Sequence, residues 1–268
     1  MINIKFFIPI ILSLLFAVSC KKDKKETPLD TGNMVIKFTH LIDGQSLQQD
    51  TMKYINAAGS VYSITEVKYF VSELTLYKSD GSKQLINQWE EIHFVDEDLP
   101  DTKTWNVYDK IPIGTYDSIT FVFGITEEKN KSFMYVNPPE VNMMWPDILG
   151  GGYHYLMING FWKNTLQQNE PYNFHLGIGQ LYAGSTISTD SIVGYVQNYF
   201  TVHLPNSSFT IQKDETKEIQ FIMNIESWFK TPHIYDHNYW GGAIMQKQLA
   251  MQMAKENGWD VFSIGYIH

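Results

Sequence analysis

The chain of 268 residues contains no arginine, so all 20 of its basic side chains are lysines, and they face 29 acidic ones. Its formal net charge is −9. Nucleic-acid-binding proteins need a basic face and usually use the planar guanidinium group to hold phosphates and bases. The composition therefore argues against a nucleic-acid binder.

Cysteine is almost as scarce, because Cys20 is the chain's single thiol. One cysteine excludes an internal disulfide and any cysteine-rich zinc or iron–sulfur site. The sequence also lacks a glycine-rich phosphate loop, a GxSxG nucleophile elbow and an HExxH zinc motif. With no nucleophile or acid–base pair indicated, we expect a protein that is not an enzyme. Its hydrophobic content of 44% is ample for the core of one domain.

The N-terminal segment has the pattern of a bacterial lipoprotein leader. Lys5 precedes an apolar run over residues 6–16, which is too short to span a bilayer comfortably but suits a signal-peptide core. Ala17-Val18-Ser19-Cys20 then resembles a lipobox, whose cysteine becomes the lipidated first residue. We expect a signal peptide over 1–19, a lipidated Cys20 with a charged tether over 20–32, and a folded domain over 33–268. The expected location is the bacterial cell envelope, anchored in the outer membrane on its periplasmic side or at the cell surface. The alternative is an ordinary secretory signal.

Period-two alternation of apolar residues dominates the rest of the chain and predicts strands. Met34, Ile36 and Phe38 share one face of the first strand, and a change of phase near Ser72 predicts a bulge. Asp80-Gly81 is a hairpin signal. Three prolines and a triple glycine make residues 126–151 a long covering loop. Further strands are predicted at 92–95, 119–123, 153–158, 172–176, 199–204, 209–211 and 219–225.

One helix is predicted near the C-terminus, from the spacing of Ile244, Met245, Leu249 and Met253. Asn257-Gly258 would stop it in the left-handed conformation. We interpret the methionines there as core residues rather than a copper-binding stripe. The expected fold is all-β, an antiparallel β-sandwich with long loops and one C-terminal helix.

Histidines are the remaining candidates for chemistry, because imidazole suits copper and zinc. His175 ends a predicted strand beside glycines, His154 follows Gly150-Gly151-Gly152 in a predicted strand, and His40 ends the first strand. For any single one, a hydrogen-bonded, half-buried side chain is the commoner role. Trp145 in the long loop either caps the core or belongs to a metal site.

Several short runs, in order, resemble the MbnP-like copper-binding protein family, in its lipoprotein branch from Bacteroidetes. They cover about residues 36–180, and the tail 257–262 also fits. The runs are Phe38-Thr39-His40-Leu41-Ile42-Asp43-Gly44, Tyr54-Ile55-Asn56-Ala57-Ala58-Gly59, Val67-Lys68-Tyr69-Phe70-Val71-Ser72, Phe94-Val95-Asp96, Ile113-Gly114-Thr115-Tyr116, Phe123-Gly124-Ile125, Met144-Trp145, Gly152-Tyr153 and Phe174-His175-Leu176-Gly177.

The resemblance implies a secreted β-sandwich that takes part in copper acquisition. In such proteins copper is held by histidines and by a kynurenine, which a secreted di-haem peroxidase-like partner makes from a tryptophan. His175 matches the family's histidine and Trp145 its tryptophan. Lys131 stands where relatives often carry another histidine. The second ligand would then come from His154, His40, His93 or the C-terminal histidines.

We therefore expect a lipid-anchored copper-binding protein whose metal site draws on His175, His154, His40 and Trp145. The alternative is a metal-free module that binds glycans or proteins on the same sandwich. It would use exposed aromatic side chains such as Trp162, Tyr239 and Trp240.

Overall fold

The computed structural model describes residues 29–88 and 91–268 of the chain. The expected signal peptide, Cys20 and most of the expected tether lie outside the described residues. Among the residues that are described, no helix has the length and apolar character needed to cross a membrane.

The first sheet is built around β1 (Thr31–Ile42), along which buried residues alternate with half-buried ones. Its order is β17-β16-β1-β2, and β7 also pairs with β1. The pair β1–β16 is parallel, while the other pairs in this sheet are antiparallel. The other strands are β2 (Gln45–Ser46), β7 (Thr104–Pro112), β16 (Thr216–Asn224) and β17 (Phe262–Ile267).

The second sheet is organised by β4 (Val61–Tyr77), which is long enough to pair with several partners along its length. The main path runs β11-β10-β4-β9-β14, and all its pairs are antiparallel. The other strands are β3 (Tyr54–Ile55), β5 (Lys83–Leu85), β6 (Ile92–Asp96), β9 (Ser118–Phe123), β10 (Leu156–Lys163), β11 (Asn169–Leu176) and β14 (Phe200–Leu204).

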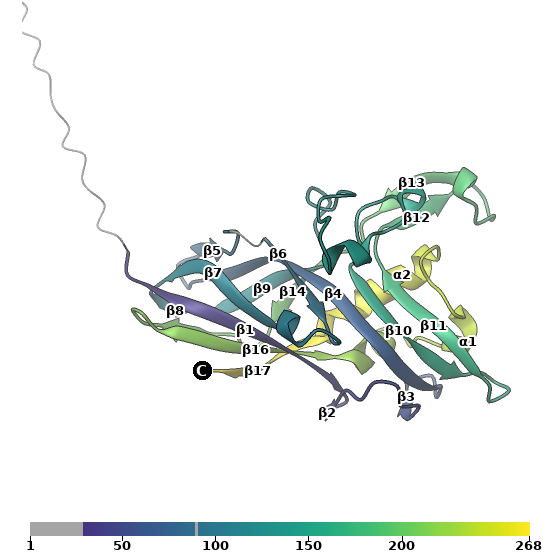
Figure 1. The fold of residues 1–268 in the computed structure, drawn as a ribbon, viewed down its shortest axis with the longest axis horizontal. Coiled ribbons are helices and arrows are strands. Elements are labelled where there is room, and N and C mark those ends of the chain that lie inside the picture. The colour runs from purple at the N-terminus through teal and green to yellow at the C-terminus, as the bar shows by residue number, and fades with distance from the viewer. Residues whose placement is uncertain (1–28, 89–90) are drawn as a thin grey trace, which may run out of the picture.

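Two small sheets and short helical turns complete the fold. The hairpin of β12 (Gly179–Tyr182) and β13 (Ile192–Val196) projects from the body of the molecule beside the long loop (Figure 1). The second pair is β8 (Gly114–Tyr116) with β15 (Phe209–Ile211). The 3₁₀ turns are η1 (Pro100–Lys103), η2 (Glu140–Met143), η3 (Asp147–Leu149), η4 (Thr189–Ser191), η5 (Ile225–Phe229) and η6 (Gly258–Asp260).

Aromatic side chains join the two main sheets. Phe121 on β9 stacks on Phe221 of β16 with ring centroids 5.7 Å apart, and Phe38 on β1 meets Tyr69 of β4 edge-on at 6.1 Å. All four rings are buried. This packing of two mostly antiparallel sheets confirms the predicted all-β sandwich.

Two local predictions are confirmed, and several strands were not predicted, namely β2, β3, β7, β8, β12 and β13. The pairing of β4 with β9 changes register between Ser72 and Thr75, which is the expected bulge. Gly81 forms the hairpin turn with a positive φ of 82°. Strand β7 escaped prediction because Asp109 occupies an inward position, where its carboxylate accepts the backbone N–H groups of residues 87 and 88.

The C-terminal helix exists, but its predicted phase was wrong. Helix α2 (Gln248–Asn257) follows a one-turn helix α1 (His237–Trp240). Leu249, one of the residues whose spacing predicted the helix, is 62% exposed, whereas Met251 is buried. The predicted left-handed stop was also wrong, because Gly258 has φ −62° and continues into η6.

Candidate functional site

Three of the four predicted metal-site residues meet in one buried cluster. The rings of His154 and His175 lie 4.9 Å apart at 87°, and the Trp145 indole lies 4.6 Å from the His154 ring. Their exposed fractions are 1% for Trp145, 6% for His154 and 7% for His175. The cluster joins the long loop to the start of β10 and the end of β11.

The triple glycine shapes the loop end of this cluster. Gly150, Gly151 and Gly152 all have positive φ, the conformation that glycine adopts at little cost. The turn lets the backbone N–H of Trp145 donate a hydrogen bond to the Gly152 carbonyl, with a distance of 2.8 Å. His154 then donates its backbone N–H to Met143 at 2.7 Å. His154 was predicted inside a strand, but it lies before β10 because its backbone pairs with the loop.

Each of the two imidazoles offers one buried nitrogen. The Nδ1 atom of His154 lies 2.9 Å from the Met143 carbonyl, and the Nε2 atom of His175 lies 2.7 Å from Asn159 Oδ1. The opposite nitrogens, His154 Nε2 and His175 Nδ1, are buried and have no hydrogen-bond partner among the described residues. Buried polar atoms are almost always paired, so two adjacent exceptions indicate a site for a ligand.

Burial keeps both imidazoles neutral. It lowers the pKa of His154 from 6.5 to about 4. Burial, with a smaller contribution from the nearby His154, lowers the pKa of His175 to about 3. Near pH 7 both rings therefore carry a free lone pair, which is the form of histidine that binds metals.

His40 does not join this cluster. Its Nδ1 atom is paired with the Glu97 carboxylate, and its Nε2 atom lies 3.1 Å from the Tyr69 hydroxyl. Both ring nitrogens are thus engaged in a different network. The structure separates His40 from the three residues with which it was grouped, because strand β1 carries it into the other sheet.

The remaining histidine candidates are also dispersed. His93 stacks between Phe38 and Trp105, and His203 is exposed on β14. His233 pairs with Glu256. His237 begins α1, and its ring is buried among the aromatic side chains of Tyr62, Trp162, Tyr172, Phe229 and Tyr235.

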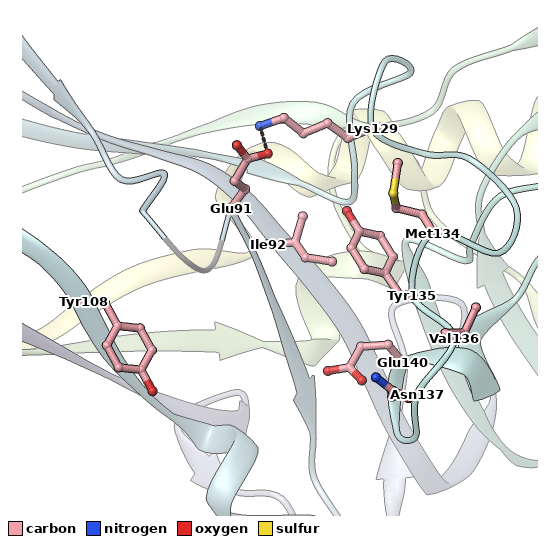
Figure 2. Close-up of a pocket in the computed structure, with 9 residues that line it drawn as sticks. All are labelled: Glu91, Ile92, Tyr108, Lys129, Met134, Tyr135, Val136, Asn137 and Glu140. Carbon is pink, nitrogen blue, oxygen red and sulfur yellow. Dashed lines mark ion pairs between the residues drawn. The ribbon is translucent and has the colours of Figure 1, made fainter.

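A separate surface groove of about 570 Å³ is lined by residues of β6, β7 and the long loop. Figure 2 shows Lys129 and Glu91 paired above Ile92 and Tyr135, with Tyr108 across the groove. Lys129 also pairs with Glu73 at 2.8 Å, so its charge is matched by carboxylates. None of the predicted metal-site residues lines this groove.

The cluster contains few side chains that can bind a metal. Within residues 29–88 and 91–268, no three His, Cys, Asp or Glu side chains converge to hold a metal, so the site offers two imidazoles and an indole. Protein zinc sites use three or four protein ligands. Imidazole suits both copper and zinc, but two imidazoles are fewer than the protein ligands of a usual zinc site.

The sequence did not reveal the groups that orient the imidazoles. Asn159 and the Met143 carbonyl each hold one ring, and Glu66 in turn accepts a hydrogen bond from Asn159. The sequence did contain a signal for Asn159, because it is a polar residue among apolar ones in a strand. It lies two residues after Met157, the residue that pairs with His175. The carbonyl of Met143 carries no side-chain signal.

Comparisons with known proteins agree with this fold. A sequence model of the MbnP family matches residues 31–246. The solved structure of MbnP from Methylosinus trichosporium has a TM-score of 0.53 and 13% sequence identity, and the alignment covers 88% of this chain and 99% of that one. A search of curated proteins found no match.

Proposed function

Because this chain belongs to the MbnP family, we propose that it is a copper-binding protein whose ligands are His154 and His175. One observation carries the proposal: two neighbouring buried imidazoles each hold a nitrogen without a partner among the described residues. Burial keeps these nitrogens unprotonated and excludes competing water. We propose that the protein acts by binding the metal and not as an enzyme.

Trp145 forms an aromatic wall of the same site and is the candidate for conversion to kynurenine. Its indole N–H donates to the Leu149 carbonyl at 3.2 Å, so the ring has a fixed orientation beside His154. An aryl amine in that place would add a third donor. The proposed catalyst is a secreted di-haem peroxidase-like partner, which would use two equivalents of peroxide to open the indole, release its C2 carbon as formate and leave the aryl amine. Co-expression with such a protein, followed by peptide mass spectrometry, tests this step, with unmodified Trp145 as the contradicting result.

The proposed location is the bacterial outer membrane, with the lipid on Cys20. The lipobox-like run before Cys20 and the charged residues after it support this assignment. Metabolic labelling with a fatty-acid analogue should mark the wild-type chain and leave Cys20→Ser unlabelled. Equal labelling of both chains would contradict the assignment.

Anaerobic competition titration of the mature chain, residues 20–268, with Cu(I) tests the copper proposal. We expect one Cu(I) per chain. His154→Ala and His175→Ala should each weaken binding by more than about 100-fold, because a direct ligand should matter more than an outer-shell group. His203→Ala is the matched control, since His203 is an exposed histidine on β14. Equal binding by all variants would overturn the proposal.

The alternative, a metal-free module that binds glycans or proteins, finds less support. Trp162 was expected to be an exposed aromatic, but it is 6% exposed and donates its indole N–H to Asn238. Tyr239 is exposed and meets Trp240 edge-on at 4.8 Å. That pair alone makes a small contact surface.

A further inference from the structure

We propose that Asn159, itself oriented by Glu66, is a positioning residue that fixes His175 in the tautomer whose Nδ1 atom is free to bind copper. The inference rests on the proposed function and concerns residues outside the ligand set. It assigns a role to a row of hydrogen-bonded polar side chains on the second sheet, running from His175 through Asn159 to Glu66.

The register of three strands, β4, β10 and β11, brings these polar side chains together. Asn159 on β10 lies directly opposite Glu66 on β4, and Met157, two residues earlier on the same face, lies opposite His175 on β11. His175 and Asn159 are therefore diagonal neighbours on one face, within reach of each other's side chains. The His175 Nε2 to Asn159 Oδ1 distance is 2.7 Å.

The protonation of His175 follows from what each partner is able to do. Glu66 accepts a hydrogen bond from Asn159 Nδ2, and an ionised carboxylate only accepts. The amide nitrogen of Asn159 must therefore face Glu66, which leaves Oδ1 facing His175. Because Oδ1 is also only an acceptor, His175 Nε2 must carry the proton. In the neutral ring the lone pair is then on Nδ1, the buried nitrogen without a partner among the described residues.

Glu66 is held in place in turn. Its carboxylate pairs with Lys68, and the Lys68 ammonium lies 3.7 Å from Asp96 Oδ2. Glu66 and Lys68 are both only partly exposed. Outer-shell groups of this kind fix the tautomer and orientation of a metal-binding histidine, and their loss costs about 10–100-fold in affinity.

The consequence is a site that is organised before copper arrives. A neutral imidazole in water exchanges between two tautomers, and only one of them offers Nδ1. Asn159 holds His175 in that form. In the same way, the Met143 carbonyl accepts the proton of His154 Nδ1 and leaves the lone pair on His154 Nε2. Binding then requires neither tautomer exchange nor ring rotation.

The test is nitrogen-detected NMR of the mature chain labelled with ¹⁵N-histidine, without copper, followed by Cu(I) titration. In the wild type His175 should show a protonated Nε2 and an unprotonated Nδ1. In Asn159→Leu the two nitrogens should show averaged shifts, and Cu(I) affinity should fall by about 10–100-fold. Asn173→Leu is the matched control, because Asn173 is the directly opposed residue on β11 and is exposed.

A double variant, Asn159→Asp with Glu66→Gln, reverses the roles of the two groups. Its carboxylate at position 159 still accepts from His175 Nε2, and its amide at position 66 donates to that carboxylate. We expect the wild-type tautomer and nearly wild-type affinity, a rescue that a purely structural role would not give. Asn159→Ser, which shortens the side chain, replaces the leucine variant if that one does not fold.

A single Nε2-protonated tautomer of His175 in the Asn159→Leu or Asn159→Ser variant would overturn the inference. So would unchanged Cu(I) affinity in a variant whose tautomers do average. The NMR result for the copper-free chain is independent of the proposed function. If the wild type shows the expected tautomer but binds no Cu(I), the copper proposal fails while the positioning of His175 by Asn159 stands.

Discussion

Gly177 lies so close to Trp145 that a Cβ atom placed on the glycine would stand 2.6 Å from Cε3 of the indole. The residue after the His175-Leu176 pair thus limits where the Trp145 indole can lie beside the His154 ring. Any side chain at position 177 must push the indole or the loop that carries it.

Gly177→Ala should therefore displace Trp145 and destabilise the fold by about 1–3 kcal/mol, the usual cost of overpacking a dense core. Chemical denaturation and the position of the tryptophan fluorescence maximum measure the two effects. Gly194→Ala is the control, because a Cβ there would meet its nearest neighbour at 3.5 Å. Equal stability of the two variants would show that the indole has room to move.

Acid should destabilise the copper-free protein through its buried histidines. The folded-state pKa values of His154 and His175, about 4 and about 3, lie below the ordinary value of 6.5. The unfolded state therefore binds protons first as pH falls, so the stability present above pH 6.5 is lost progressively toward pH 4. Denaturant midpoints from pH 8 to pH 4 measure the slope. The double variant His154→Gln with His175→Gln should flatten it, and an identical slope would contradict this origin.

Glu226 should act in the opposite direction. Its carboxylate accepts the Tyr62 hydroxyl at 2.6 Å and the Ala57 N–H, and burial raises its pKa from 4.5 to about 7. The folded state thus favours the protonated form, and its contribution to stability is lost as pH rises from 4.5 through 7. Glu226→Gln should be more stable than wild type at pH 8, with the difference vanishing by pH 5. A difference that does not change with pH would refute the shift.

Helix α2 gives a direct test of which face it buries. Met251→Ala should cost about 2–4 kcal/mol, because it removes a fully buried side chain, while Leu249→Ala should cost about 0.5 kcal/mol or less. Thermal or urea denaturation of both variants measures the difference. A larger loss of stability in Leu249→Ala than in Met251→Ala would contradict the buried face that the structure gives to α2.

Much of the β-structure was predictable because alternation marks a strand with one buried face. The pattern from Met34 to Phe38 and the bulge after Ser72 needed no tertiary information. The helix phase was not predictable, since Ala250 and Ala254 contribute little to an apolar pattern yet form the buried face with Met251. Strand β7 was hidden by the buried carboxylate of Asp109.

The site was predictable as a set of candidates but not as a geometry. His175, His154 and Trp145 were each identified, yet sequence alone gave His40 the same standing as His154. The two histidines differ in their hydrogen-bond partners. His40 contacts Glu97 and Tyr69, whereas His154 contacts a backbone carbonyl and its Nε2 atom has no partner in the part of the chain that the structure describes. Such partners come from distant strands and loops, so no local pattern encodes them.

The central claim is that His154 and His175 together bind copper. X-ray absorption spectroscopy of the mature chain loaded anaerobically with one equivalent of Cu(I) tests it most directly. The account predicts a low-coordinate copper whose outer-shell scattering fits two imidazoles, and loss of one imidazole contribution in His175→Ala. A copper shell dominated by sulfur, or a spectrum unchanged in both His154→Ala and His175→Ala, would contradict it.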